Sequence, residues 1–352
     1  MSRFLSSEFS EIKPYTPGEQ PQNVKYIKLN TNESPYPPSP NVVKAITEKE
    51  CENLRLYSDP TVKTLVDEIA TFYNVDAKNV IVGNGSDEIL AFSFLAFGGN
   101  KEFAYPDITY GFYPVYAKLF GIKSNVIPLT NSFDVDENDY LKANQNVIIA
   151  NPNAPTGKII SHTQIEKILK AHPNDIVIID EAYVDFGGET CVSLINKYDN
   201  LLVVQTFSKS RNLAGARIGF GIANSEIIAD LNKMKFSFNP YNINRLSIIA
   251  GTQSMKDFSY FKECTNKIIA TRDNTVNSLK ELGFDVLDSK ANFIFIKNNK
   301  IKGEVFYNKL RENGILVRWF NIDRIKDYVR VTIGSKEEME EFINKTKQII
   351  EV

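Results

Sequence analysis

Four short apolar runs of the chain each lead into a polar segment whose residue types can bind or react. The runs are residues 79–83, 146–150, 175–180 and 200–206, and the segments at their ends are 83–87, 151–157, 180–183 and 207–219. Runs that are apolar without alternation are typical of parallel strands buried on both faces. Ligands of open α/β sheets bind beyond the carboxyl ends of such strands. We therefore expect the four segments to meet in one crevice.

Together the segments offer an amine, an acid, hydrogen-bond donors and an anion site. Lys209 has Ser208 beside it, and Arg217 follows eight residues later. Asp180 ends a buried run, where an acid costs free energy unless it meets a cation or donors. Gly-Asn-Gly-Ser-Asp (83–87) is a glycine turn that leads into a helix. The N–H groups and the dipole of a helix N-terminus favour a phosphate.

Each segment also has an ordinary interpretation when it is taken alone. Most lysines are solvated surface residues, Ser86 or Asp87 could be a plain N-cap, and Asn153 could be a turn residue. Taken jointly, the segments fit one cofactor, pyridoxal 5′-phosphate (PLP). This cofactor needs an amine for its aldehyde, an acid for its ring nitrogen, donors for its phenolate and an anion site for its phosphate.

The elements that must position these segments follow an α/β pattern. From about residue 60 to 225 apolar strands alternate with helical patterns, which predicts a doubly wound, mostly parallel sheet. The first helix of this region should have Asp59 as N-cap and Pro60 at its first position. Beyond about residue 245 the pattern indicates a smaller α+β domain. We expect three parts, namely an arm with the start of the small domain (1–45), a large PLP-binding domain (46–245) and a C-terminal small domain (246–352).

Local signals refine this picture. Capping boxes are predicted at 161–164 and 335–338, where a serine is followed three residues later by Gln or Glu. The chain has two histidines, His162 and His172, and both follow surface-helix patterns. Acid–base chemistry at neutral pH should therefore fall to another group with a shifted pKa.

Composition narrows the class of protein. A chain of 352 residues with 43% hydrophobic and 24% charged residues can build two ordinary globular domains. The net charge of −2 offers no basic surface for nucleic acid or an anionic membrane. We expect no secretory signal, because the N-terminus has no apolar core region, and no membrane span, because the longest apolar run (89–97) is too short to cross a bilayer. We expect no metal site, because the three cysteines are far apart and lack zinc-type spacing. These features favour the cytoplasm.

Eight blocks of the sequence carry a resemblance to a known family. They are 26–40, 54–61, 83–90, 107–116, 151–157, 178–186, 206–220 and 329–335, among them Asn-Pro-Asn-Ala-Pro-Thr-Gly and Thr-Phe-Ser-Lys-Ser-Arg-Asn-Leu-Ala-Gly-Ala-Arg. Over nearly its whole length the chain resembles the fold-type-I, class II PLP-dependent aminotransferases. It is most similar to the histidinol-phosphate aminotransferase family. The resemblance implies a large doubly wound domain, a smaller α+β domain and a homodimer.

The resemblance also implies roles around the cofactor. Lys209 would be the Schiff-base lysine and the proton shuttle, with neighbouring charge from Arg217 lowering its pKa. Asp180 would pair with the ring nitrogen, and Tyr183 with Asn153 would bind the ring oxygen. Tyr110 would stack on the ring face. The contacts implied at the cofactor phosphate are Gly85, Ser86, Asp87, Thr206, Ser208 and Arg217, and Tyr57 would reach the phosphate of the cofactor bound to the partner subunit.

The implied substrate site contains Tyr15, Asn32, Arg318 and Arg330. Arg330 would bind the carboxylate of the amino-acid co-substrate, and Tyr15 with Arg318 would contact a substrate phosphate. Two departures from the family pattern occur. Ala154 stands where some members have a second Asn, and Trp319 has no role that we can assign.

The activity implied is transamination between L-histidinol phosphate and 2-oxoglutarate, which gives imidazole-acetol phosphate and L-glutamate in histidine biosynthesis. Two other enzymes of the same fold remain open alternatives: an O-phospho-amino-acid decarboxylase and an aromatic amino-acid aminotransferase. A PLP-sensing regulator would need a DNA-binding module, and the residues before 26 leave no room for one.

Overall fold

The computed structural model describes residues 2–21 and 26–351. Its larger sheet has seven strands in the order β2 (Val80–Asn84), β8 (Ile218–Ala223), β7 (Leu201–Thr206), β6 (Val177–Asp180), β5 (Gln145–Ala150), β3 (Glu102–Pro106) and β4 (Ser124–Ile127). All neighbours are parallel except β8, which runs antiparallel to β2 and β7. The four apolar runs are thus confirmed as strands of a mostly parallel sheet. β3, β4 and β8 were not identified from the sequence.

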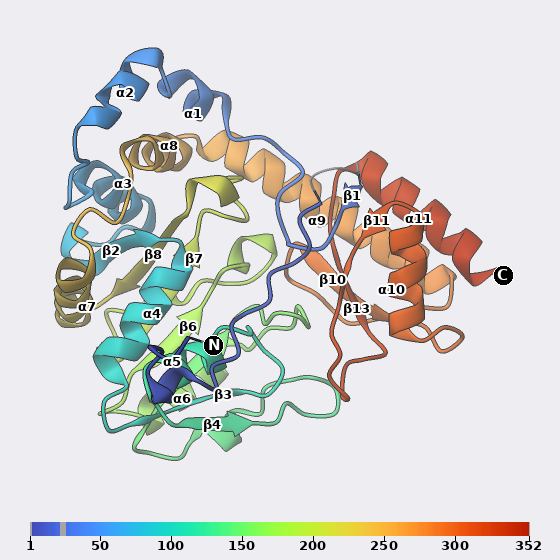
Figure 1. The fold of residues 1–352 in the computed structure, drawn as a ribbon, viewed down its shortest axis with the longest axis horizontal. Helices are drawn as coiled ribbons and strands as arrows, with labels where there is room; N and C mark the ends of the chain where they lie inside the picture. Colours follow the sequence, from blue (N-terminus) through green and yellow to red (C-terminus); the bar gives the residue numbers. More distant parts are fainter. Residues whose placement is uncertain (1, 22–25, 352) are drawn as a thin grey trace.

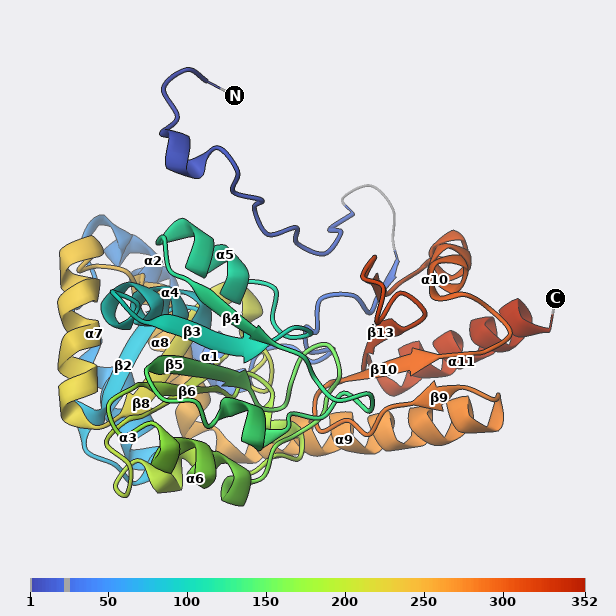
Figure 2. The same cartoon turned by 90° about the horizontal axis from the view of Figure 1, so that it is seen from below.

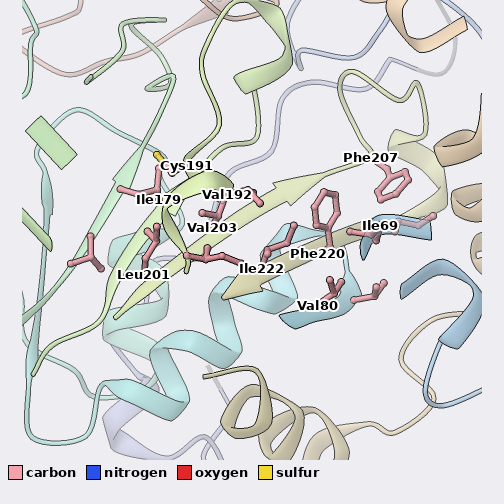
Figure 3. Packing of buried hydrophobic residues seen from close by; sticks show 14 of the residues in the cluster. Ile69, Val80, Ile179, Cys191, Val192, Leu201, Val203, Phe207, Phe220 and Ile222 are labelled. Carbon is pink, nitrogen blue, oxygen red and sulfur yellow. The ribbon is translucent and has the colours of Figure 1, made fainter. Parts of the chain in front are cut away.

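Helices cover both faces of this sheet (Figure 1). One face packs against α3 (Lys63–Tyr73), α6 (His162–Ala171) and α8 (Arg245–Lys256), and the other against α4 (Ser86–Phe97), α5 (Tyr113–Leu119) and α7 (Ser225–Phe238). Successive strand residues point to opposite faces, so Val203 joins the first core and its neighbours Leu202 and Val204 the second. Figure 3 shows Ile69 of α3 and Val203 of β7 within the first core.

Two local expectations are corrected by the structure. Helix α3 begins at Lys63, so Asp59 is not its N-cap and Pro60 is not its first residue. The Asp59 carboxylate instead accepts from the N–H groups of Thr61 and Lys63 in a turn. That turn ends at Val62, whose φ of 52° is left-handed and cannot continue into a right-handed helix.

His172 is the other correction, because it is fully buried rather than on a helix surface. It caps the end of α6, where the chain turns its imidazole inward. Its Nε2 lies 2.6 Å from the carbonyl oxygen of Tyr140, and its Nδ1 lies 3.3 Å from the Asp175 carboxylate. His162 is partly exposed beside Glu189. Both predicted capping boxes are confirmed, at the starts of α6 and α11.

A second, antiparallel sheet lies beside the first (Figure 1). Its strands are β12 (Arg318–Trp319), β13 (Val329–Thr332), β10 (Phe293–Lys297) and β9 (Asp285–Val286). Helices α9 (Phe258–Glu281), α10 (Gly303–Glu312) and α11 (Lys336–Ile350) pack on it around a core of their own. β1 (Ile27–Lys28) pairs in parallel with β11 (Ile315–Leu316), which brings the early chain to this smaller unit.

The remaining elements are short. In the described part of the chain they are α1 (Pro40–Ala45), α2 (Glu48–Glu52) and 3-10 helices at Ser7–Phe9, Asn53–Arg55, Ala77–Asn79, Glu137–Tyr140, Val184–Phe186, Cys191–Leu194 and Ala214–Ala216. In Figure 2 the blue N-terminal segment, residues 2–21, runs along the outside of the body above α5. In the ranges that the structure describes, no helix has the length and apolar character needed to cross a membrane.

Candidate active site

The predicted polar segments meet at one edge of the large sheet. The parallel strands β2, β5, β6 and β7 end there, and the antiparallel β8 begins there. A cavity of about 970 Å³ opens at this edge and extends to the smaller sheet. Its lining includes Asp180, Tyr183, Lys209 and Arg217 from the large sheet, with Arg318 and Arg330 from the small one. Because β8 is reversed, Arg217 precedes its strand and still reaches the edge where the other strands end.

Lys209 lies in the loop after β7, with its side chain in the cavity. Its Nζ donates to the carbonyl oxygen of Thr31 at 3.1 Å and lies 5.8 Å from the centre of the Tyr183 ring. Burial, and then the charge of Arg330, lower the pKa of Lys209 to about 8. Arg217 contributes less than Arg330, although the sequence pointed to Arg217. Roughly a tenth of such amines are neutral at pH 7, and a neutral amine is what a nucleophile or a base requires.

Asp180 is the last residue of β6 and is buried. One carboxylate oxygen accepts from the Tyr113 hydroxyl at 2.8 Å and the other from the Ala182 N–H at 3.2 Å. Burial raises the pKa of Asp180 to about 6, since these neutral donors offset only part of the desolvation cost. Among the residues that the structure describes, no cationic side chain pairs with it. A cationic ring nitrogen would supply the missing partner.

Tyr113 was not identified from the sequence as a site residue. It lies in the block 107–116 that carries the family resemblance, three residues after Tyr110. This spacing places both tyrosines near the start of α5, and their rings meet edge to face at 5.7 Å. Tyr110 lines the cavity and donates its hydroxyl proton to Asp87 at 2.7 Å.

The glycine turn and Arg217 form a polar cup at one end of the cavity. Gly85, with φ of 78°, immediately precedes α4, and a Cβ at this position would collide with the Arg217 guanidinium. Arg217 forms an ion pair with Asp87 at 2.9 Å. The cup also contains Ser86 and the hydroxyls of Thr206 and Ser208, which lie 3.0 Å apart. A cation, hydroxyl groups and a helix N-terminus together suit a phosphate.

Asn153 is buried in the loop after β5 and has hydrogen-bond partners within the protein. Its side-chain amide donates to the Ile108 carbonyl and to the Thr156 hydroxyl, both at 3.0 Å, and accepts from Thr109 at 2.9 Å. Both amide protons are therefore engaged within the protein. The neighbouring Ala154, not Asn153, appears in the cavity lining.

The two arginines of the small sheet face the cavity from the opposite side. Arg330 donates to the Asn30 carbonyl at 2.8 Å, and its guanidinium lies 5.4 Å from the centre of the Phe293 ring. Its Nε is buried and has no hydrogen-bond partner among the residues described. Arg318 donates to the carbonyls of Thr16 and Pro17 at 2.9 and 3.3 Å. Within the described chain neither has a carboxylate partner, which leaves both able to bind anions.

Of the other predicted substrate and partner residues, Tyr15 and Asn32 line the cavity and Tyr57 lies on the surface. Tyr15 lines the cavity mouth and stacks on Phe112 at 4.3 Å between ring centres. Tyr57 is 80% exposed, stacks on Tyr241 at 4.4 Å and does not line the cavity of its own chain. Asn32 is buried and donates to the Tyr183 hydroxyl at 2.9 Å.

This arrangement meets the requirements of PLP. Lys209 offers an amine, and Asp180 offers an acid that has no cationic partner among the described residues. Tyr183 offers a hydroxyl group, and the polar cup around Arg217 suits a phosphate. At Gly85 the left-handed φ of 78° favours glycine, and a side chain there would push the Arg217 guanidinium out of its present position. The residues present therefore fit the cofactor.

Comparison with known proteins agrees with this chemistry. A family model described as aminotransferase class I and II matches residues 24–345. The chain is 56% identical to a histidinol-phosphate aminotransferase of Brachyspira hyodysenteriae over 99% of both proteins. The crystal structure of the histidinol-phosphate aminotransferase from Clostridium acetobutylicum superposes with a TM-score of 0.84 at 26% identity, over 92% of this chain and 99% of that one.

A further crystal structure, a histidinol-phosphate aminotransferase from Sinorhizobium meliloti in complex with PLP, has a TM-score of 0.82 at 21% identity. It covers 92% of this chain and 90% of its own. This likeness concerns the fold, which agrees with the fold type expected from the sequence. On the match of its sequence, which spans nearly the whole chain, this protein belongs to the PLP-dependent aminotransferases of class I and II, as the eight blocks predicted.

Proposed function

We propose that the protein transfers the amino group of L-histidinol phosphate to 2-oxoglutarate, giving imidazole-acetol phosphate and L-glutamate in histidine biosynthesis. The observation that carries this proposal is the pair Arg318 and Arg330, which face the cavity without carboxylate partners. Arg217 is part of the polar cup and pairs there with Asp87, so the two other arginines are available for substrate anions. One substrate brings a phosphate and the other two carboxylates, and guanidinium groups bind both.

We propose the following contacts for the cofactor. Arg217, with Ser86, Thr206 and Ser208, would hold its phosphate, and Asp180 would pair with its ring nitrogen. Bound PLP supplies an electron-withdrawing ring that accepts the charge developed when a substrate C–H bond is broken. The role of Asp180 is to keep the ring nitrogen cationic, and the Tyr113 hydroxyl orients its carboxylate toward the cavity.

Lys209 is the group that would move the substrate proton. Its pKa of about 8 gives it a neutral fraction at physiological pH, and Arg330 opposes its protonation. Arg330 would bind the carboxylate beside the amino group of glutamate, and Arg318 with Tyr15 would bind the phosphate of histidinol phosphate. Each charge-assisted contact of this kind contributes about 1.5–3 kcal/mol.

We also propose a homodimer with shared active sites. Tyr57, Tyr241 and Phe238 are exposed aromatic residues, with Phe238 75% exposed, and a second copy of the chain would cover them. Tyr57 would then reach the cofactor phosphate of the partner subunit. We retain the division into 1–45, 46–245 and 246–352 as a proposal. The two sheets with their separate cores support a large and a small unit, and α8 (Arg245–Lys256) packs in the core of the large one. The proposed location is the cytoplasm.

Product analysis tests the proposal. Purified enzyme with PLP, histidinol phosphate and 2-oxoglutarate should form glutamate and the ketone phosphate in equal amounts, and Lys209→Ala should form neither. An O-phospho-amino-acid decarboxylase would release carbon dioxide without any need for 2-oxoglutarate. Faster turnover of unphosphorylated histidinol or of an aromatic amino acid would refute the assignment of substrate and leave the class of reaction standing.

A further inference from the structure

Asn32 lines the cavity and is held by hydrogen bonds of both its backbone and its side chain. Its φ of 57° is left-handed, and the side chain is buried. Its N–H donates to the Thr332 hydroxyl oxygen at 2.9 Å, and its carbonyl oxygen accepts from the Asn292 amide at 3.0 Å. Its side chain bonds Thr332 and the Tyr183 hydroxyl, each at 2.9 Å. The small sheet thus fixes an amide against a tyrosine that belongs to the large unit.

The hydrogen bonds determine which way this amide faces. Since Thr332 Oγ1 already accepts the Asn32 N–H, its own proton needs an acceptor, and Asn32 Oδ1 at 2.9 Å is the one it has. With Oδ1 toward Thr332, Nδ2 must face Tyr183 as a donor. The reversed amide would leave the buried Thr332 proton without a partner, which is costly.

The consequence concerns the proton of Tyr183. Its hydroxyl oxygen accepts from Asn32, so its own proton must point elsewhere. Within the described chain that proton has no acceptor, while Tyr183 lines the cavity next to Lys209. Burial raises the pKa of Tyr183, so the proton is present at neutral pH. The edge-on contact with Phe293, at 5.0 Å between ring centres, fixes the plane of the tyrosine ring.

We infer that Asn32 is a positioning residue, which directs the Tyr183 proton into the cavity and makes Tyr183 the hydroxyl donor to the ring oxygen of PLP. The inference rests on the proposed cofactor contacts and replaces the expected role of Asn32 as a substrate contact.

The visible absorption band of PLP bound to Lys209 gives a test that needs no substrate. The Schiff-base nitrogen between PLP and Lys209 loses its proton as the pH rises, and the ring oxygen then carries its full negative charge. A hydrogen-bond donor to that oxygen stabilises this deprotonated form. Loss of the donor should therefore raise the midpoint of the titration, which is the pH at which half of the bound cofactor has changed its absorption band. We expect a rise of about one to two pH units in Tyr183→Phe, the size of one hydrogen bond to a charged group. Asn32→Gly, which suits the left-handed backbone, should raise it by about one unit.

The double variant Asn32→Gly/Tyr183→Phe should show no rise beyond that of Tyr183→Phe, because Asn32 acts through Tyr183. Thr332→Val keeps the side-chain shape while releasing the Asn32 amide, and should raise the midpoint too if the glycine variant fails to fold. Asn74→Gly is the matched control, since Asn74 is an exposed left-handed asparagine that ends α3. Its midpoint should equal that of the wild type.

The outcomes separate this inference from the proposed function. An unchanged midpoint in Asn32→Gly and Thr332→Val, or an additive rise in the double variant, overturns the positioning role alone. A wild-type protein that shows no visible band with PLP overturns the cofactor assignment itself. An increase in KM for histidinol phosphate with an unchanged midpoint would restore Asn32 to the substrate site.

Discussion

The variant Asp180→Asn can measure separately two effects of the buried carboxylate. One is its cost to the stability of the fold, and the other is its contribution to cofactor binding. Burial raises the pKa of Asp180 from 3.8 to about 6, despite the hydrogen bonds from Tyr113 and Ala182. A shift of about two units corresponds to about 3 kcal/mol. Because the folded state binds this proton more tightly, the penalty is absent below pH 3.8, grows as the pH rises, and is complete above about pH 6.

The variant has no charge to desolvate, but it offers one acceptor oxygen where Asp180 uses two, at a cost of about 1 kcal/mol. Without PLP we therefore expect Asp180→Asn to be more stable than the wild type by about 1–2 kcal/mol at pH 8. At pH 5 the carboxylate penalty is about half as large, so most of the advantage should vanish. Bound PLP should reverse the order, since only the carboxylate pairs with a cationic ring nitrogen.

Melting temperatures of both proteins, stripped of PLP and measured from pH 5 to pH 8, give the first comparison. An advantage of this size should appear as a difference of a few degrees. The measurement is then repeated at saturating PLP. A stability difference that does not change with pH would refute the assigned cost of burial. Equal stabilisation of both proteins by PLP would refute the pairing of Asp180 with the ring.

The other predictions concern the cofactor lysine, the substrate arginines and the assembly. Borohydride reduction of the PLP-loaded protein should label Lys209, and label on any other lysine would contradict the site. Arg318→Ala should lower kcat/KM for histidinol phosphate about 10- to 150-fold with PLP affinity unchanged; a change within about twofold would mean that Arg318 only holds the arm. Arg330→Ala should slow the glutamate half-reaction at least as much. Mixed dimers of Lys209→Ala and Tyr57→Phe subunits should recover activity, and inactive mixed dimers would count against shared sites.

Much of this protein could be read from short stretches of its sequence. Continuous apolar runs identified β5, β6 and β7 because strands buried on both faces need no polar alternation. Capping boxes identified the starts of α6 and α11 because the bonds involved span three residues. The same logic placed Lys209 and Asp180 at one sheet edge, since parallel strands share their carboxyl end.

What the sequence could not determine depends on contacts between distant parts of the chain. Tyr113 binds Asp180 across 67 positions, and Asn32 binds Tyr183 across 151. No local pattern reports such pairs, because they exist only once elements that are far apart in the sequence pack together. The charge that most lowers the pKa of Lys209 comes from Arg330 on the other sheet for the same reason.

Two predictions made from local sequence were wrong, for His172 and for the start of α3, and in both cases contacts outside the local sequence decided the outcome. A histidine at a helix end can face water or the interior with equal local cost, and only the packing of α6 against the sheet buries His172. Asp59 and Pro60 carry a proper helix-start signal, yet the chain uses them in a turn that delays α3 to Lys63. The sequence by itself thus determined four strands of the large sheet, two capping boxes and the chemical groups at the sheet edge. Tertiary structure decided which of those groups hold one another and how burial sets their pKa values, because desolvation and long-range hydrogen bonds arise only in the packed molecule.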